Sequence, residues 1–161
     1  MNNGFYRGGS NNEQDNPILN LIALQASIPA FSAYQSIAQS LATSTLTKLQ
    51  FQTKEFDTGA YFDAVTNFRF LPLVAGYYQV NGAFAVATVA ATMTLIIFKN
   101  GASFKTGSNG ATSGGGTVNA LVFFNGTTDF IELFASQSAA AQNTVATATS
   151  TYFQAVLVKT V

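Results

Sequence analysis

Alternation of apolar and polar residues with a two-residue period is the main pattern of the chain from Pro29 onward. The clearest example is residues 78–86, where every second position is apolar or small. Successive side chains of a β-strand point to opposite faces, so this period predicts a strand with one packed face. Short runs rich in Phe, Tyr, Val and Thr, separated by Gly and Asn, continue the pattern. It is typical of an all-β protein.

Two Asn-Gly pairs predict tight turns between such runs. Asn100-Gly101 follows residues 95–99, and Asn125-Gly126 follows residues 118–124. Both residue types tolerate the positive φ that a two-residue hairpin turn of type I′ requires. We therefore expect a β-hairpin at each pair.

Three stretches differ in composition from the alternating strands. Residues 107–116 are rich in Gly and Ser and are expected to form an exposed loop. Residues 136–150, rich in Ala and Thr, are compatible with a loop or an edge strand. The most apolar window, residues 83–98, is interrupted by threonines and is too short to span a bilayer, so it predicts buried sheet.

The N-terminal part of the chain predicts an arm. Residues 1–16 are rich in Asn, Gly and Ser and contain too few apolar side chains to offset the entropy of ordering. Residues 17–28 begin with Pro after a potential Asn16 cap, which permits either a short helix or an extended segment. We divide the chain into an arm, residues 1–28, and a β domain, residues 29–161.

The arm contains a candidate anchor for a partner. Phe5, Tyr6 and Arg7 are the large side chains among the first ten residues apart from Met1. Aromatic residues and Arg are enriched at interface hot spots, so we predict that these three bind another protein. The alternative is a tail without a partner.

Composition narrows the classes of partner. Charged residues make up only 9% of the 161 residues, against about 25% in soluble proteins. Seven basic and seven acidic residues cancel, which argues against nucleic-acid and membrane partners. The first ten residues lack the apolar core of a signal peptide, so we expect the protein to act where it is made or to leave by lysis.

The candidates for catalysis and metal binding are few. The chain has no His and no Cys, which removes the usual general base, nucleophile pairs and zinc ligands, so we expect no enzyme activity and no cofactor. Glu55, Asp57 and Asp63 could hold calcium, but their spacing favours solvated charges and turn residues. Asp129 and Glu132 differ by an odd number of positions, which places them on opposite faces of a strand and argues against an acid–base pair.

Two further motifs have simple explanations. The glycine-rich residues 107–116 lack the Lys and the strand-to-helix context of a phosphate-binding loop. Asn125-Gly126-Thr127 fits the glycosylation pattern, but it is better explained as a turn. The 15 Phe and 6 Tyr residues are expected in the core and at a subunit interface rather than in a sugar-binding platform.

Residues 56–78, FDTGAYFDAVTNFRFLPLVAGYY, resemble the signature of the C1q-like family, also called complement and tumour-necrosis-factor-like heads. In both, an aromatic residue is followed by a Thr-Gly-type turn, Phe, Pro and then Gly-x-Tyr. The likeness extends over residues 29–159. Further landmarks in family order are Ala30-Phe31-Ser32-Ala33, Phe98-Lys99-Asn100-Gly101, residues 126–133 and residues 152–157.

The chain also departs from the family pattern. Asn67 and Ala155 stand where the family usually has Gly, two residues separate Gly126 from Asp129, and no collagen stalk precedes the head. An animal immune role is therefore not expected. The resemblance implies a ten-strand antiparallel jelly-roll sandwich, a homotrimer with an apolar axis, and a role in recognition or assembly.

These observations predict a non-enzymatic virion structural protein. The favoured hypothesis is a trimeric capsid decoration or cement protein of a tailed phage, which binds other virion proteins through its N-terminal arm. It would lie on the virion surface and be assembled in the host cytoplasm. The alternative is the receptor-binding knob of a tail fibre or spike, which recognises a host surface glycan or protein.

Overall fold

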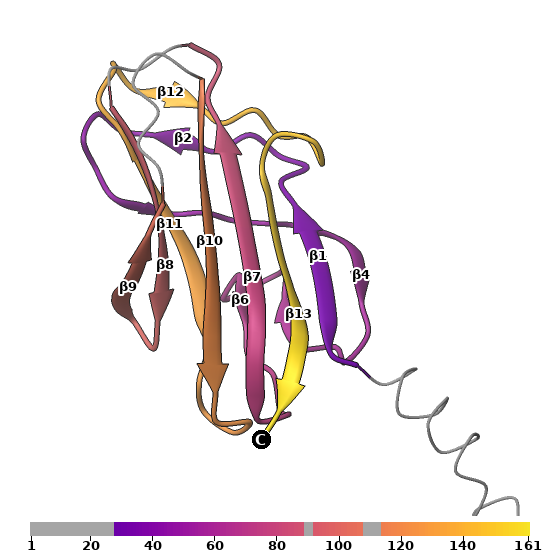
Figure 1. Ribbon diagram of the computed structural model, residues 1–161. Helices are drawn as coiled ribbons and strands as arrows, with labels where there is room; N and C mark the ends of the chain where they lie inside the picture. Colours follow the sequence, from indigo (N-terminus) through magenta and orange to yellow (C-terminus); the bar gives the residue numbers. More distant parts are fainter. Residues whose placement is uncertain (1–27, 89–91, 108–113) are drawn as a thin grey trace, which may run out of the picture.

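The described part of the chain is an all-β sandwich (Figure 1). A computed structural model describes residues 28–88, 92–107 and 114–161. These ranges contain thirteen strands and no helix, as the all-β sequence pattern predicted. The strands are β1 (Ala30–Tyr34), β2 (Ser40–Leu41), β3 (Thr47–Lys48), β4 (Thr53–Asp57), β5 (Phe62–Asp63), β6 (Arg69–Phe70), β7 (Gly76–Ala85), β8 (Met93–Lys99), β9 (Ala102–Thr106), β10 (Gly115–Phe124), β11 (Ile131–Gln137), β12 (Gln142–Asn143) and β13 (Tyr152–Thr160).

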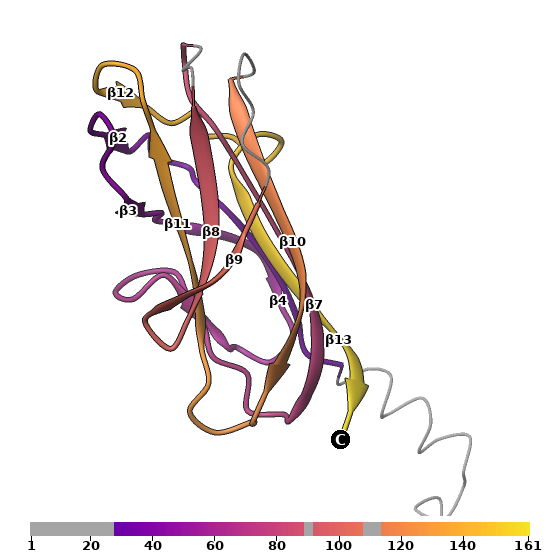
Figure 2. The same cartoon turned by 60° about the vertical axis from the view of Figure 1, so that its left-hand side comes forward.

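Two antiparallel sheets pack face to face, as Figure 2 shows from the side. One sheet has the strand order β10-β7-β13-β1-β4, and the other has the order β5-β6-β11-β8-β9 with β3 added beside β11. Strands β2 and β12 form a separate short pair. The two main paths contain five strands each, which confirms the expected ten-strand jelly roll. The sequence pattern did not predict the three short additional strands.

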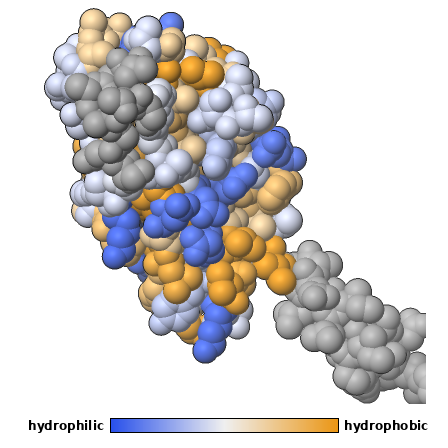
Figure 3. Space-filling model, turned by 45° about the horizontal axis from the view of Figure 1, so that its top comes forward, coloured by the Kyte–Doolittle hydropathy of each residue, from blue (hydrophilic) through white to orange (hydrophobic). Residues whose placement is uncertain are grey.

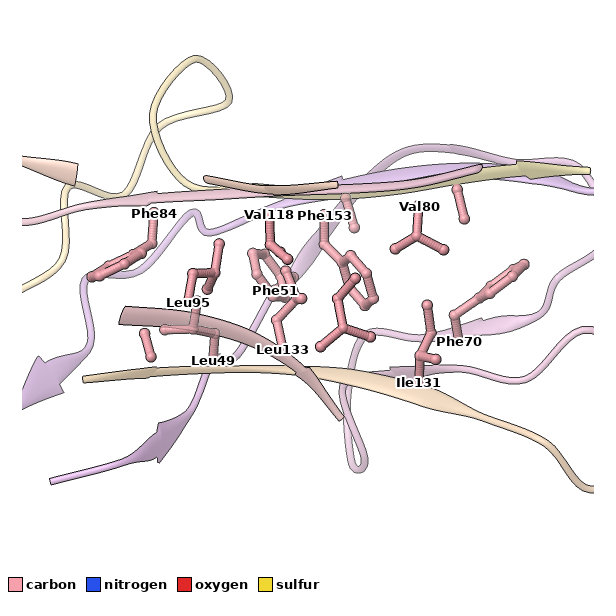
Figure 4. Packing of buried hydrophobic residues seen from close by; sticks show 14 of the residues in the cluster. Leu49, Phe51, Phe70, Val80, Phe84, Leu95, Val118, Ile131, Leu133 and Phe153 are labelled. Atoms are coloured by element: carbon pink, nitrogen blue, oxygen red, sulfur yellow. The ribbon is translucent and has the colours of Figure 1, made fainter. Parts of the chain in front are cut away.

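The core lies between the sheets and is rich in aromatic rings. Tyr78, Val80 and Phe84 point inward from β7 and are fully or almost fully buried, which confirms the two-residue period read from the sequence. Figure 4 shows Val80, Phe84, Val118 and Phe153 meeting Leu95, Ile131 and Leu133 from the opposite sheet. Phe31 stacks on both Phe62 and Phe70, with ring centroids 4.7 and 4.5 Å away. Such offset and edge contacts stabilise aromatic cores beyond their buried area.

One of the two predicted hairpins is present and the other is wrong. Asn100 and Gly101, with φ values of 54° and 80°, join the paired strands β8 and β9. The Asn125-Gly126 turn instead connects β10 in one sheet to β11 in the other. The Asn125 side-chain oxygen accepts hydrogen bonds from the backbone N–H groups of Thr127, Thr128 and Asp129. This side chain closes the turn locally, without any pairing of the flanking strands.

The other predicted segments fall as follows. Residues 83–98 supply the end of β7 and most of β8, in different sheets, with residues 89–91 outside the described ranges. Residues 136–150 contain the end of β11, the edge strand β12 and connecting loops. Of the predicted loop at 107–116, residues 108–113 lie outside the described ranges, and β10 already begins at Gly115.

The predicted arm, residues 1–28, lies outside the described residues except for Ile28, and so do Phe5, Tyr6 and Arg7. Both remain predictions. At the point where the description begins, the Thr58 hydroxyl donates to the Ile28 carbonyl (2.8 Å) and the Leu157 N–H donates to the Pro29 carbonyl (2.9 Å). The chain therefore enters the sandwich at the end where β13 finishes (Figure 1).

The opposite end of the sandwich is held by a buried polar network. The Thr144 hydroxyl donates to the Gln35 side-chain oxygen (2.5 Å), and the Gln35 amide donates to the Gln39 side-chain oxygen (3.0 Å). The Gln39 backbone N–H donates to the Thr144 hydroxyl (2.9 Å). Buried polar groups destabilise a core unless they are hydrogen-bonded, and these close a ring of bonds. The network fixes the loop between β1 and β2 to the segment after β12.

Candidate assembly interface

The outer face of the five-stranded sheet lacks charged side chains over most of its width. Strands β10, β7 and β1 contain no charged residue, and β13 contains only Lys159, which lies next to its last residue and opposite Tyr77 at one end of the face. We call the outward-pointing residues of these four strands the uncharged face. They are Ala30, Ser32, Tyr34, Tyr77, Gln79, Asn81, Ala83, Thr117, Asn119, Leu121, Phe123, Tyr152, Gln154 and Val156.

Strand register aligns the apolar residues of this face in two rows. Phe123 lies opposite Tyr77, and their ring centroids are 5.5 Å apart. In the next row, Gln79 lies between Leu121 and Val156. The large apolar side chains are 40–55% exposed, and a bulge in β13 leaves Val158, at the margin of the face, 62% exposed. Exposed apolar groups gathered in this way mark an interaction surface.

A polar row crosses the same face beside the apolar rows. Asn119, Asn81, Gln154 and Ser32 are successive cross-strand neighbours on β10, β7, β13 and β1. The Gln154 amide donates to the Ser32 hydroxyl (3.0 Å), which donates to a Glu55 carboxylate oxygen (2.6 Å). Figure 3 shows a hydrophilic band across the middle of the molecule with hydrophobic surface below it.

The polar row retains unused hydrogen-bonding capacity. Among the described residues, the side chain of Asn119 has no hydrogen-bond partner. The Gln79 amide already donates to the Asn81 side-chain oxygen (3.2 Å). Interface centres are depleted in charged residues and contain well-placed hydrogen bonds. The uncharged face combines both properties, with apolar rows for burial and a carboxamide row that can fix the register of a partner.

The three carboxylates considered for calcium have separate roles. Asp57 accepts hydrogen bonds from the backbone N–H groups of Tyr61 and Phe62, and it pairs with Lys54 at 3.1 Å. Glu55 accepts the Ser32 bond described above. The described residues contain no group of three or more acidic, His or Cys side chains placed to hold a metal ion.

Asp63 organises the turn between β5 and β6. Its two oxygens accept hydrogen bonds from the backbone N–H groups of Val65, Thr66 and Asn67. These bonds, that from Thr66 above all, hold the pKa of the Asp63 carboxyl far below its usual range. Asp57 and Asp63 are therefore turn residues, as their spacing favoured.

Asp129 and Glu132 pair with different lysines. Asp129 precedes β11 and contacts Lys99 at 2.9 Å, whereas Glu132 contacts Lys48 at 2.5 Å. Burial opposes the charged form of Asp129, yet hydrogen bonds from Lys99, Asn100 and the Asn125 backbone keep its pKa below the usual value. The two carboxylates belong to separate ion pairs.

Comparison with known proteins identifies the fold. The sequence matches no protein-family model and no curated protein. Among solved structures, murine APRIL is similar with a TM-score of 0.65 and 12% identity, over 81% of this chain and 99% of APRIL. Eiger TNF from S. frugiperda has a TM-score of 0.64 and 8% identity, over 84% of this chain and 95% of that one. The PRD1 vertex protein P5 has a TM-score of 0.60 and 15% identity, over 81% of this chain and 97% of P5.

The chain is a C1q- and TNF-like jelly roll. The likeness confirms the fold that residues 56–78 suggested. At these identities it carries the jelly-roll architecture and does not transfer a ligand or a partner.

Sequence reasoning missed the uncharged face of this jelly roll, although a signal for it is present. No charged residue occurs between Arg69 and Lys99, between Lys105 and Asp129, or between Glu132 and Lys159. The long strands of the face, β7, β10 and β13, lie within or at the edge of these intervals. Within the described ranges, no helix could cross a membrane.

Proposed function

We propose that the chain is a non-enzymatic virion structural protein that assembles as a homotrimer through its uncharged face. The observation that carries this proposal is a continuous, uncharged sheet face with exposed apolar rows. Burial of such a face removes apolar surface from water, and the desolvation penalty is small because few charged groups are buried. The C1q-like resemblance supports three copies around one axis, and the likeness to a phage vertex protein supports a virion.

The finer proposal is a capsid decoration or cement protein of a tailed phage, displayed on the virion surface after assembly in the host cytoplasm. In this role the head forms the trimer and the arm, residues 1–28, attaches it to other virion proteins. Phe5, Tyr6 and Arg7 are the proposed contacts, because aromatic and Arg side chains dominate interface hot spots.

Light scattering of the purified protein tests the assembly directly. The expected mass is three times the 17.0 kDa of one chain. A folded protein that remains monomeric at micromolar concentration would contradict the trimer.

Deletion of residues 2–16 separates the roles of arm and head. The shortened protein is expected to fold and trimerise, because the deleted residues contribute little apolar surface, but to lose attachment to the parent particle. Truncated and intact trimers are mixed with undecorated particles, and the co-sedimenting fraction is measured. Equal attachment would mean that the head itself makes the contact.

Localisation by cryo-electron microscopy separates the capsid role from the alternative, a receptor-binding knob. Density for the head on the capsid lattice is the expected result. Density at a tail tip, together with saturable binding to host cells, would favour the knob.

A further inference from the structure

An open cleft of about 300 Å³ lies at the β5–β6 edge of the six-stranded sheet, away from the uncharged face. Its walls come from the turn before β5, the β5–β6 hairpin and the segment after β6. The lining residues include Ala60, Asp63, Asn67, Arg69, Leu71 and Leu73.

Two charged residues line this cleft, Asp63 and Arg69, and neither forms an ion pair among the described residues. Arg69 is the positively charged one. Its guanidinium lies over the Phe130 ring, 4.7 Å from the centroid, which fixes its position. Asp63 is its cross-strand neighbour, but the hydrogen bonds of the β5–β6 turn already occupy both Asp63 oxygens. No carboxylate of the described residues forms an ion pair with Arg69.

The walls of the cleft are held in an unusual backbone conformation. Ala60 and Phe68 have φ values of 55° and 47°, in the left-handed region that residues other than Gly seldom adopt. Hydrogen bonds from Tyr61 and Phe62 to Asp57 hold the first of these turns, and Asp63 holds the second. Backbone strain that the surrounding structure maintains is concentrated at functional sites.

The chemistry of the cleft selects a carboxylate beside apolar side chains. The planar guanidinium of Arg can bond both oxygens of a carboxylate. Leu71 and the 58% exposed Leu73 provide an apolar wall next to it. A sugar would require several free hydrogen-bonding groups, whereas the Asn67 amide nitrogen is already bonded to Asp63. An acidic peptide therefore fits better than a glycan.

The chain itself contains such a peptide outside the described residues. Glu13 and Asp15 are the two acidic residues before Ile28, and Pro17-Ile18-Leu19 follows them. Ile28 is bonded to Thr58, two residues before Ala60 on the cleft wall. The 13 steps along the backbone from Asp15 to Ile28 span up to about 45 Å when extended, which is ample to reach the cleft of the same or an adjacent copy.

We propose that the Arg69 cleft binds the acidic residues 13–15 of the arm, with Leu71 and Leu73 receiving the apolar side chains that follow. This contact sets the direction in which the arm leaves the head. It does not depend on what the uncharged face binds.

Disulfide trapping in the full chain tests the proposal, because the protein has no native Cys. Gln14→Cys is combined with Leu73→Cys in the cleft. The matched control combines Gln14→Cys with Phe104→Cys, since Phe104 is 41% exposed on β9 at the opposite edge of the same sheet. Rapid cross-linking is expected for Leu73→Cys and not for Phe104→Cys. The gel mobility of the product shows whether the arm binds its own copy or a neighbour.

Two further variants show whether charge drives the contact. Arg69→Leu, and separately Glu13→Gln with Asp15→Asn, should each reduce the cross-linking rate at Leu73→Cys about tenfold, the effect of one lost charge-assisted hydrogen bond. The arm variant cannot disturb the cleft, so it remains informative if Arg69→Leu misfolds. Equal rates at the two edges, or a rate unchanged by the arm variant, would overturn the proposal in favour of another occupant.

Discussion

The two sheets have similar inner faces but different outer faces. On the six-stranded sheet, the half-buried rings of Phe98 and Phe134 lie 4.2 Å apart, and the Lys48–Glu132 ion pair lies beside them. On the five-stranded sheet, Tyr77 and Phe123 are a comparable ring pair at one end of the uncharged face, where Lys159 lies opposite Tyr77 and the Lys99 ammonium lies 5.8 Å from the centroid of the Phe123 ring. The ring pairs do not separate the two faces, but the position of the charges does. The six-stranded sheet carries an ion pair beside its rings, whereas the lysines near the uncharged face lie only at one end of it.

This difference indicates which face is suited to a partner. A buried charge needs a compensating charge and hydrogen bonds on the partner. Burial of the outer face of the six-stranded sheet, which carries the ion pair, is therefore unfavourable. The uncharged face needs only shape and a few amide hydrogen bonds. This chain has few charged residues, so the positions of these residues are what best distinguish a face exposed to solvent from a face suited to contact with a partner.

The largest effect is expected from placing a charge on the uncharged face. Leu121→Glu should abolish the trimer, because a buried carboxylate without a partner costs about 3 kcal/mol or more per copy. Leu46→Glu is the matched control, since Leu46 is also an exposed leucine but precedes β3 in the six-stranded sheet. Sedimentation velocity measures both. Trimers that tolerate both changes equally would remove the distinction between the faces.

A substitution beneath the uncharged face should destabilise the fold. A Cβ at Gly76 would lie 2.4 Å from the Lys159 carbonyl oxygen, and the extra methyls of Val would increase the clash with β13. We expect Gly76→Val to lower the free energy of unfolding by about 2 to 3 kcal/mol. Gly110→Val, in the predicted loop outside the described residues, should be tolerated. Similar melting temperatures for the two variants would contradict the close approach of β7 and β13.

The stability of the fold should be sensitive to acid, because two hydrogen-bonded carboxylates contribute to it. Asp63 and Asp129 have folded-state pKa values below the ordinary 3.8, so their stabilisation is present above that pH and is lost as the pH falls through the folded-state values. The melting temperature of the wild type should therefore fall below about pH 4. Asp129→Asn should lower stability by about 2 kcal/mol at pH 7 and make the acid dependence shallower. An unchanged acid profile in this variant would contradict the Lys99–Asp129 contribution.

The smallest effect is expected from a chelator. Because Glu55, Asp57 and Asp63 bond to different groups, EDTA should change neither the melting temperature nor the mass in solution. The same measurements in added calcium are the control. A large drop in melting temperature with EDTA would show that a metal ion stabilises the fold.

Local patterns were sufficient to predict most strands. The alternation from residue 78 to residue 86 correctly identified the inward face of β7, and Asn100-Gly101 correctly located a hairpin. Asn125-Gly126 has the same turn chemistry but lies between sheets. Turn residues specify the backbone of the turn, whereas sheet membership depends on long-range packing that two residues do not encode.

The candidate interface was harder to predict, for a physical reason. Gln79, Leu121 and Val156 are 35 or more positions apart in the sequence, and only the register of β7, β10 and β13 brings them into one row. Arg69 lay within the family-like segment, yet nothing in the sequence distinguishes an unpaired Arg from a paired one. That distinction required the hydrogen bonds that occupy Asp63.

The position of the two chain ends has a practical consequence for display. The entry of β1 and the exit of β13 lie at the same end of the sandwich, and the β2–β12 pair lies at the other end (Figure 1). A peptide fused after Val161 would begin near Pro29, whose carbonyl accepts a hydrogen bond from the Leu157 N–H. The exposed turn at residues 43–45 lies between β2 and β3, away from both ends of the chain. An epitope inserted there would be displayed far from both chain ends.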